Sequence, residues 1–262
     1  YYIPASLLYK SFKTMSVLAS GAVVRQVLLS AGAEESQIMA KLQPIATDMH
    51  ALGNPWISYS VYLNNSFLPG LLQLMILLVT VFSIGSEMKR ATSREWLRTA
   101  DDSIIIAITG KLIPQTIIFF SMGLLYLSLL YGYLHFPMHN SIWHMIFAMF
   151  LLVVASQSFA VIIMCFAPSL RIGLSVGGLV GVLSLSIAGF SFPVPAMYLP
   201  FQAISYVLPV RHYFLIYVDQ ALNGIPLYYS RVHYVALILF AVASTPLLPR
   251  LKKALMRQVY VP

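Results

Sequence analysis

Long apolar runs alternate with short polar segments along most of this chain of 262 residues. Five runs are long enough for a helix that crosses a hydrocarbon core of about 30 Å, which takes about 20 residues. They cover Phe67 to Gly85, Ile104 to Tyr133, Trp143 to Phe166, Ile172 to Phe190 and Val232 to Leu248. Pro114, near the start of the second run, predicts a kink there. The pattern therefore predicts a mainly α fold, a polytopic bundle of transmembrane helices over residues 67–262.

Residues 1–66 are more polar and predict a partial α+β domain. Ser11 to Leu29 carries an apolar helical stripe, but its basic residues lie too close together to bracket a span. Ala33 to Leu42 is a second helical candidate. Trp56 to Leu63 alternates apolar and polar residues, which is typical of a strand. We expect residues 1–66 to be the C-terminal part of an extracytoplasmic domain.

Composition supports a membrane protein, because 59% of the residues are hydrophobic and only 9% are charged. The net charge of +8 comes from lysines and arginines at the ends of the apolar runs, which indicates membrane topology rather than nucleic acid binding. Basic residues mark the segments after the first and third runs and the C-terminal tail as cytoplasmic. An odd number of runs then places residues 1–66 outside, so we expect a further transmembrane helix upstream of Tyr1.

Few residues suggest chemistry. Cys165 lies in an apolar run and is expected to be a buried thiol. Three histidines, His135, His139 and His144, have no accompanying carboxylate or thiolate, so we expect no metal site. Lys111 is followed by leucine instead of the serine or threonine of a phosphate loop, so the chain is not expected to bind ATP.

Two further features concern packing and charge. The fourth run has glycines at a spacing of four (Gly173, Gly177 and Gly181), which predicts close helix packing. Arg211 and Asp219 lie in the segment between the last two runs and are expected among solvent or lipid headgroups.

The stretch Glu87 to Asp102 reads EMKRATSREWLRTADD and predicts an amphipathic helix in the membrane interface. A solvated basic turn is the alternative. Its residues, with those that open the next run, form an ordered series: Glu87, Arg90, Thr92, Thr99, Gly110, Lys111, Leu112 and Pro114. The series resembles the E-x-E-x-G-T, T-P and G-K-L-x-P elements of the membrane subunits of ABC-2 type (type V) ABC exporters. It departs from them at Lys89, Ala91 and Ala100, which replace a glutamate, a glycine and a proline.

A second series follows the fourth run, in the sequence AGFSFPVPAMYLP. It comprises Gly189, Phe190, Phe192, Pro193, Met197 and Pro200, then Pro209, Arg211, His212 and Phe214. This order is similar to the G-F-x-F-P, M-x-x-P and P-x-x-H/R-x-F elements of the same family. The resemblance implies short re-entrant helices, at about residues 190–214, that cap the translocation path. An aromatic interfacial loop without a gating role is the alternative.

The resemblance implies the permease subunit of an ATP-driven exporter in the bacterial inner membrane, which moves an amphipathic drug, lipid or similar molecule outward. It also implies a homodimer or heterodimer, a separate ABC ATPase that holds ATP and Mg, a periplasmic adaptor and contact with membrane lipid. The implied coupling-helix residues are Glu87, Arg90, Thr92, Glu95, Trp96 and Thr99. The implied external gate comprises Gly189, Phe190, Phe192, Pro193, Met197, Pro200 and Pro209. Two other classes stay open: a membrane transferase that uses external histidines, and an assembly subunit that does not transport.

Overall fold

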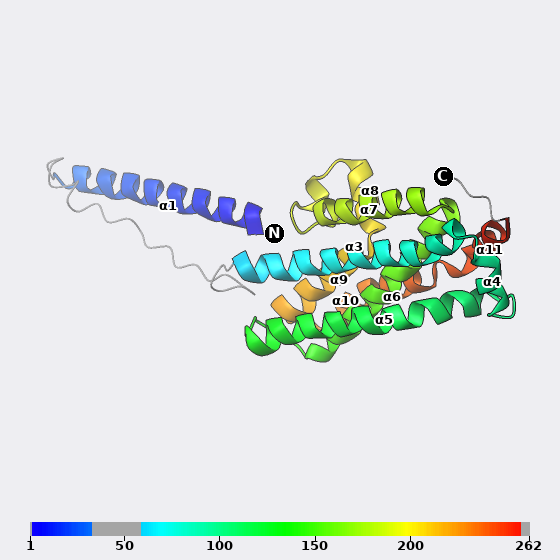
Figure 1. The fold of residues 1–262 in the computed structure, drawn as a ribbon. Helices are drawn as coiled ribbons and strands as arrows, with labels where there is room; N and C mark the ends of the chain where they lie inside the picture. Colours follow the sequence, from blue (N-terminus) through cyan, green and yellow to red (C-terminus); the bar gives the residue numbers. More distant parts are fainter. Residues whose placement is uncertain (1, 33–58, 258–262) are drawn as a thin grey trace. The chain divides into compact units, whose positions relative to one another are not determined.

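The computed structural model describes residues 2–32 and 59–257 (Figure 1). The chain divides into two units, residues 1–51 and residues 52–262. Every regular element in the described ranges is a helix, in agreement with the predicted fold class.

The described part of the first unit is a long helix, α1, from Tyr2 to Ser30. Its segment Leu7–Ser30 is long and apolar enough to cross a membrane. The helix was predicted, but the prediction that this segment is too short to span was wrong. Long basic side chains on a helix can reach the membrane interface, so they need not limit a span. The helix predicted at Ala33 to Leu42 falls outside the described residues.

The second unit is a bundle built on five long helices. They are α3 (Tyr59–Lys89), α5 (Ile104–Leu127), α6 (Ile142–Phe166), α7 (Leu170–Ile187) and α10 (Leu227–Val242). These helices match the five predicted runs. Together with α1 they give six candidate spans in the described ranges. The helix expected upstream of Tyr1 stays a prediction.

The strand predicted at Trp56 to Leu63 is wrong from Tyr59 onward, because α3 begins there. Val61 is buried against the bundle, and Tyr62 donates a hydrogen bond to the carbonyl of Phe190. These tertiary contacts favour helix over the local alternation of apolar residues. Trp56 to Ser58 fall outside the described residues.

The core is centred on α6, which is the most buried of the candidate spans and packs against α3, α5 and α10. Helix α7 packs along α3, and glycines line the contact as predicted. A Cβ atom at Gly173 would lie 2.9 Å from Cγ1 of Val81, and one at Gly85 would lie 3.0 Å from Cα of Leu170. The two backbones approach this closely only because these positions carry no side chain.

Shorter elements lie at the ends of the long helices. Helix α4 (Ser93–Arg98) and the C-terminal α11 (Leu248–Arg257) lie together at one end of the bundle (Figure 1). A π-helical turn, Ser128–Tyr133, extends α5, which is helical on both sides of Pro114. The chain between α7 and α10 forms a 3₁₀ turn (Val194–Ala196), α8 (Leu199–Tyr206), α9 (Pro209–Tyr217) and a π-helical turn (Val218–Leu222).

Candidate functional site

The two sequence series described above lie at two separate places in the bundle. The first is around α4. The helix predicted over residues 87–102 is divided there: Glu87 lies in the last turn of α3, a turn follows at residues 90–92, and α4 covers only Ser93–Arg98. Ala91 has a φ of 58°, a left-handed conformation that continues no α-helix. The family series has glycine at this position, and the positive φ explains why, because only glycine adopts a positive φ without cost.

An ion pair joins the two halves of the first series. Lys111 Nζ lies 2.6 Å from Oε1 of Glu87, so it links α5 to α3. The hydroxyl of Thr92 donates a hydrogen bond to the same carboxylate. Lys111 Nζ also lies 4.3 Å from the ring centroid of Trp96, a cation–π contact with α4. We call Glu87, Thr92, Trp96 and Lys111 the α4 cluster.

Three members of the α4 cluster, Glu87, Thr92 and Trp96, belong to the predicted coupling helix, whereas Lys111 belongs only to the sequence series. The structure adds Lys111 as the residue that contacts the other two helices. The remaining predicted coupling residues, Arg90, Glu95 and Thr99, are exposed and lie outside the cluster. They are available to a partner, whereas the α4 cluster is partly enclosed.

Helix α11 holds α4 from the other side. Ser93 Oγ donates a hydrogen bond of 2.8 Å to the carbonyl of Leu255, and Arg94 donates two to the carbonyl of Met256. Leu97 of α4 is fully buried in one apolar cluster with Leu251 and Leu255 of α11. From the sequence, this part of the chain is predicted only to be a basic cytoplasmic tail. The spacing of Leu248, Leu251 and Leu255 between basic residues was the signal that could have identified an amphipathic helix.

The second series shapes the chain after α7. Gly189 has a φ of 102°, which turns the chain back toward the bundle. Phe190 is buried, at 3% exposed, and packs edge to face on Phe214 with ring centroids 5.6 Å apart. Pro209 is the first residue of α9, where its missing N–H leaves no hydrogen bond unmade. These three predicted gate residues lie inside the bundle.

The other predicted gate residues lie nearer the surface. Phe192 is 50% exposed, Pro200 is exposed at the start of α8, and Pro193 and Met197 are half-buried beside the 3₁₀ turn. The carbonyl of Met197 accepts a hydrogen bond of 2.7 Å from Gln202 of α8. The structure therefore brings the predicted gate residues into two groups, one buried and one on the surface.

Helix α9 begins deep in the bundle. Gln73, midway along α3, accepts a hydrogen bond of 2.8 Å from the backbone N–H of Val210 and donates one of 2.9 Å to Ser184 of α7. It therefore satisfies a donor of the first turn of α9, a position that needs a partner when it is buried. All but one residue of α9 is buried. This short helix is thus enclosed by α3, α6 and α10.

Arginine, histidine and cysteine side chains lie in different surroundings in the bundle. Arg211 is 7% exposed, so the expectation that it lies in solvent or among headgroups was wrong. His139 Nδ1 lies 2.9 Å from the carbonyl of Ala221, a contact that joins the loop before α6 to the π-helical turn after α9. The described residues hold no group of three potential metal ligands. Cys165 is buried, as predicted.

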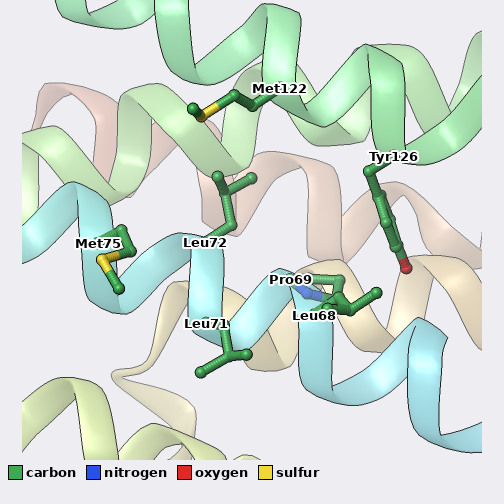
Figure 2. A pocket seen from close by; sticks show the side chains of 7 residues that line it. All are labelled: Leu68, Pro69, Leu71, Leu72, Met75, Met122 and Tyr126. Carbon is green, nitrogen blue, oxygen red and sulfur yellow. The ribbon is translucent and has the colours of Figure 1, made fainter.

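An apolar pocket of about 210 Å³ lies between α3 and α5 (Figure 2). Leu72 points from α3 toward α5, and Tyr126 extends from α5 toward α3 (Figure 2). The other lining residues are Leu68, Pro69, Leu71, Met75 and Met122. Met75 and Met122 are about half exposed, so the pocket opens at the surface of the bundle. Such a lining accommodates hydrocarbon and offers almost no polar contact.

Comparison with known proteins agrees with this arrangement. No curated protein matches the chain. The family model described as ABC-2 family transporter protein matches residues 1–248, which is nearly the whole chain. The family supplies membrane components of ABC transporters, and the multiple apolar helices fit a multi-pass membrane protein. The chain therefore belongs to the ABC-2 transporter family and is a permease component, a transport subunit rather than an enzyme.

Proposed function

We propose that the chain is the permease subunit of an ATP-driven exporter that moves an amphipathic molecule out of the bacterial cytoplasm or inner membrane. It works as a dimer with a separate ABC ATPase, which holds ATP and Mg, and it passes its substrate toward a periplasmic adaptor. The α4 end faces the cytoplasm, because most of the basic residues outside α1 lie there.

One observation carries the proposal: the α4 cluster and α11 join a short, partly exposed helix to several membrane helices at once. A displacement of α4 by the ATPase is transmitted to α3 through Glu87, to α5 through Lys111 and to α11 through Ser93. Charge-assisted hydrogen bonds of this kind are short and directional. The ATPase contacts are assigned to Arg90, Glu95 and Thr99, which are exposed.

The buried α9 supplies the moving part at the external side. It is joined to α3 and α7 through Gln73, so a change in the angle between these two helices alters the support of α9. Phe190 packs against Phe214 of α9, and this aromatic pair closes the path in the resting state. The apolar pocket between α3 and α5 favours the proposal of an amphipathic substrate or lipid, because its apolar lining can accommodate a hydrocarbon chain.

The test is to express the chain with its neighbouring genes, purify it through a tag on this subunit and measure ATP hydrolysis in the preparation. We expect a co-purifying ATPase. Glu87→Gln and Lys111→Gln should each lower its turnover. The double variant should be no worse than the more affected single variant, because both changes remove the same ion pair.

The matched control is Asp101→Asn. Asp101 lies in the turn after α4 with a φ of 49°, a conformation that asparagine tolerates, so this change removes a nearby carboxylate without strain. A preparation without an ATPase would remove the energy source and contradict the exporter. Equal turnover in Glu87→Gln and Asp101→Asn would contradict transmission through the ion pair.

A further inference from the structure

Arg211 is a buried cation without an acidic partner among the described residues. It is the third residue of α9 and is 7% exposed. Its Nη1 donates a hydrogen bond of 3.1 Å to the carbonyl of Ala188, and its guanidinium carbon lies 4.7 Å from the ring centroid of Tyr206. Its Nε is buried and has no hydrogen-bond partner.

This arrangement leaves much of the charge uncompensated. A guanidinium does not lose its proton in a protein, so burial cannot neutralise it. No aspartate or glutamate occurs anywhere in residues 170–218, which include α7, α8 and α9. The next carboxylate along the chain, Asp219, accepts a hydrogen bond of 2.9 Å from Ser230. One carbonyl and one ring face are a weak replacement for the hydration that the cation loses.

The surrounding backbone is shaped to hold this guanidinium in place. Gly189 has a φ of 102°, and a Cβ atom there would lie 2.6 Å from Nη1 of Arg211 and 2.8 Å from Cγ2 of Val194. The turn after α7 therefore closes on the guanidinium only because residue 189 is glycine. A fixed position favours ligand binding, because little side-chain freedom remains to be lost.

A partly exposed aromatic ring lies over the guanidinium. Tyr206, whose ring covers it, is 56% exposed. The apolar side chains of Phe201 and Ile204 on the same helix, α8, and of Val207 directly after it are about half exposed. The cation can bind the charged headgroup of an anionic amphiphile, and the exposed apolar side chains beside it can bind the hydrocarbon chain.

We propose that Arg211 binds the anionic headgroup, a phosphate or carboxylate, of an amphipathic molecule whose chain lies along α8. A tetrahedral or planar oxyanion accepts hydrogen bonds from two guanidinium nitrogens at once, which would give the unpartnered Nε an acceptor. The inference rests on the proposed function and names its substrate class: amphiphiles with a negative charge.

The test compares two ligands that share a chain and differ in net charge. Decyl phosphate and decyl phosphocholine are titrated onto the purified chain in a neutral maltoside detergent, without ATP or ATPase, and the thermal unfolding midpoint gives their apparent affinities. We expect about tenfold tighter binding of decyl phosphate by the unaltered chain, as one charge-assisted interaction provides. Arg211→Gln should bring the ratio close to one.

Arg231→Gln is the matched control. Arg231 also stacks on a tyrosine ring, 3.8 Å from the centroid of Tyr228, but it is exposed, so its loss should leave the preference intact. Arg211→Lys keeps the charge without the planar fork and should retain part of the preference. It serves as the test if Arg211→Gln does not yield a monodisperse protein.

Several results would overturn the proposal. A preference that survives in Arg211→Gln, or that is lost equally in Arg231→Gln, would place the anion elsewhere. Equal stabilisation by inorganic phosphate alone would refute the amphiphile and indicate a small-anion site. Because the titration contains no ATPase, its failure is separate from a failure to find the energy source of the exporter.

Discussion

The contact between α3 and α7 gives a sharp prediction from two glycines on the same helix. A Cβ atom at Gly181 would lie 3.1 Å from Cβ and 3.2 Å from Cα of Leu74, so it meets the backbone of α3. A Cβ atom at Gly178 would lie 3.8 Å from Cδ2 of Leu78, an ordinary van der Waals distance. Gly181→Ala should therefore strain the contact, whereas Gly178→Ala should fit.

The changes in the free energy of unfolding can be compared, because both substitutions replace glycine by alanine inside the same helix. Replacing glycine by alanine inside a helix favours folding by about 1 kcal/mol. Overpacking a tight contact costs about 1–3 kcal/mol. Gly178→Ala should thus be neutral or more stable by up to about 1 kcal/mol. Gly181→Ala should be less stable than Gly178→Ala by about 1–3 kcal/mol, since the helix term cancels in this difference.

The assay is equilibrium unfolding of the purified chain in detergent, followed by circular dichroism and by the retention of a monodisperse peak after heating. Both variants are measured beside the unaltered chain at one detergent concentration. Equal stability of Gly181→Ala and Gly178→Ala would refute the inference that the backbone of α3 limits the space at Gly181. A lower stability of Gly178→Ala alone would show that the tight contact with α3 lies at Gly178 and not at Gly181.

Two further predictions concern single positions. Ala91→Gly should raise the free energy of unfolding by up to about 1 kcal/mol, because the φ of 58° strains alanine and not glycine. The control Ala100→Gly should lower the free energy of unfolding. A lower free energy of unfolding in Ala91→Gly, measured by the same assay, would contradict the assigned turn. Burial, with the nearby Arg211 and His233, lowers the pKa of His212 below its ordinary value of 6.5, so the folded state favours the neutral ring. The unfolded chain then binds the proton more readily, and stability should fall as the pH drops through about 6.5. The measurement is the unfolding midpoint from about pH 8 to pH 5. His212→Gln should flatten the decline in stability, whereas the exposed control His135→Gln should not. An unchanged slope in His212→Gln would refute the assignment of the decline to His212.

Much of the membrane architecture could be predicted because each part of it is local. A run such as Trp143 to Phe166 is apolar all round, and the structure places α6 at Ile142–Phe166, in the centre of the bundle. The glycine spacing in the fourth run likewise predicted a close helix contact, and the Cβ distances at Gly173 confirm one. Such features follow from composition and period within a single helix.

The errors have a common physical origin. The alternation before Phe67 resembled a strand, but contacts of Val61 and Tyr62 with the bundle make it the first turns of α3. Arg211 was expected in solvent because its segment lies outside the apolar runs, yet α9 returns into the bundle. In each case residues distant in the sequence supply the contacts that decide the local structure. The assignment of residues 1–66 to an external domain stays a prediction.

By itself, the sequence determined that this protein is a helical membrane protein with spans close to those in the structure, because about 20 apolar residues per helix is a requirement of the hydrocarbon core. Its two ordered series also indicated the family. Only the tertiary structure decided that Lys111 pairs with Glu87, that Gln73 supports α9, and that Arg211 is buried without a carboxylate. The physical reason is that a pairing between helices depends on their relative rotation and depth, and neither is encoded in the period of one helix alone.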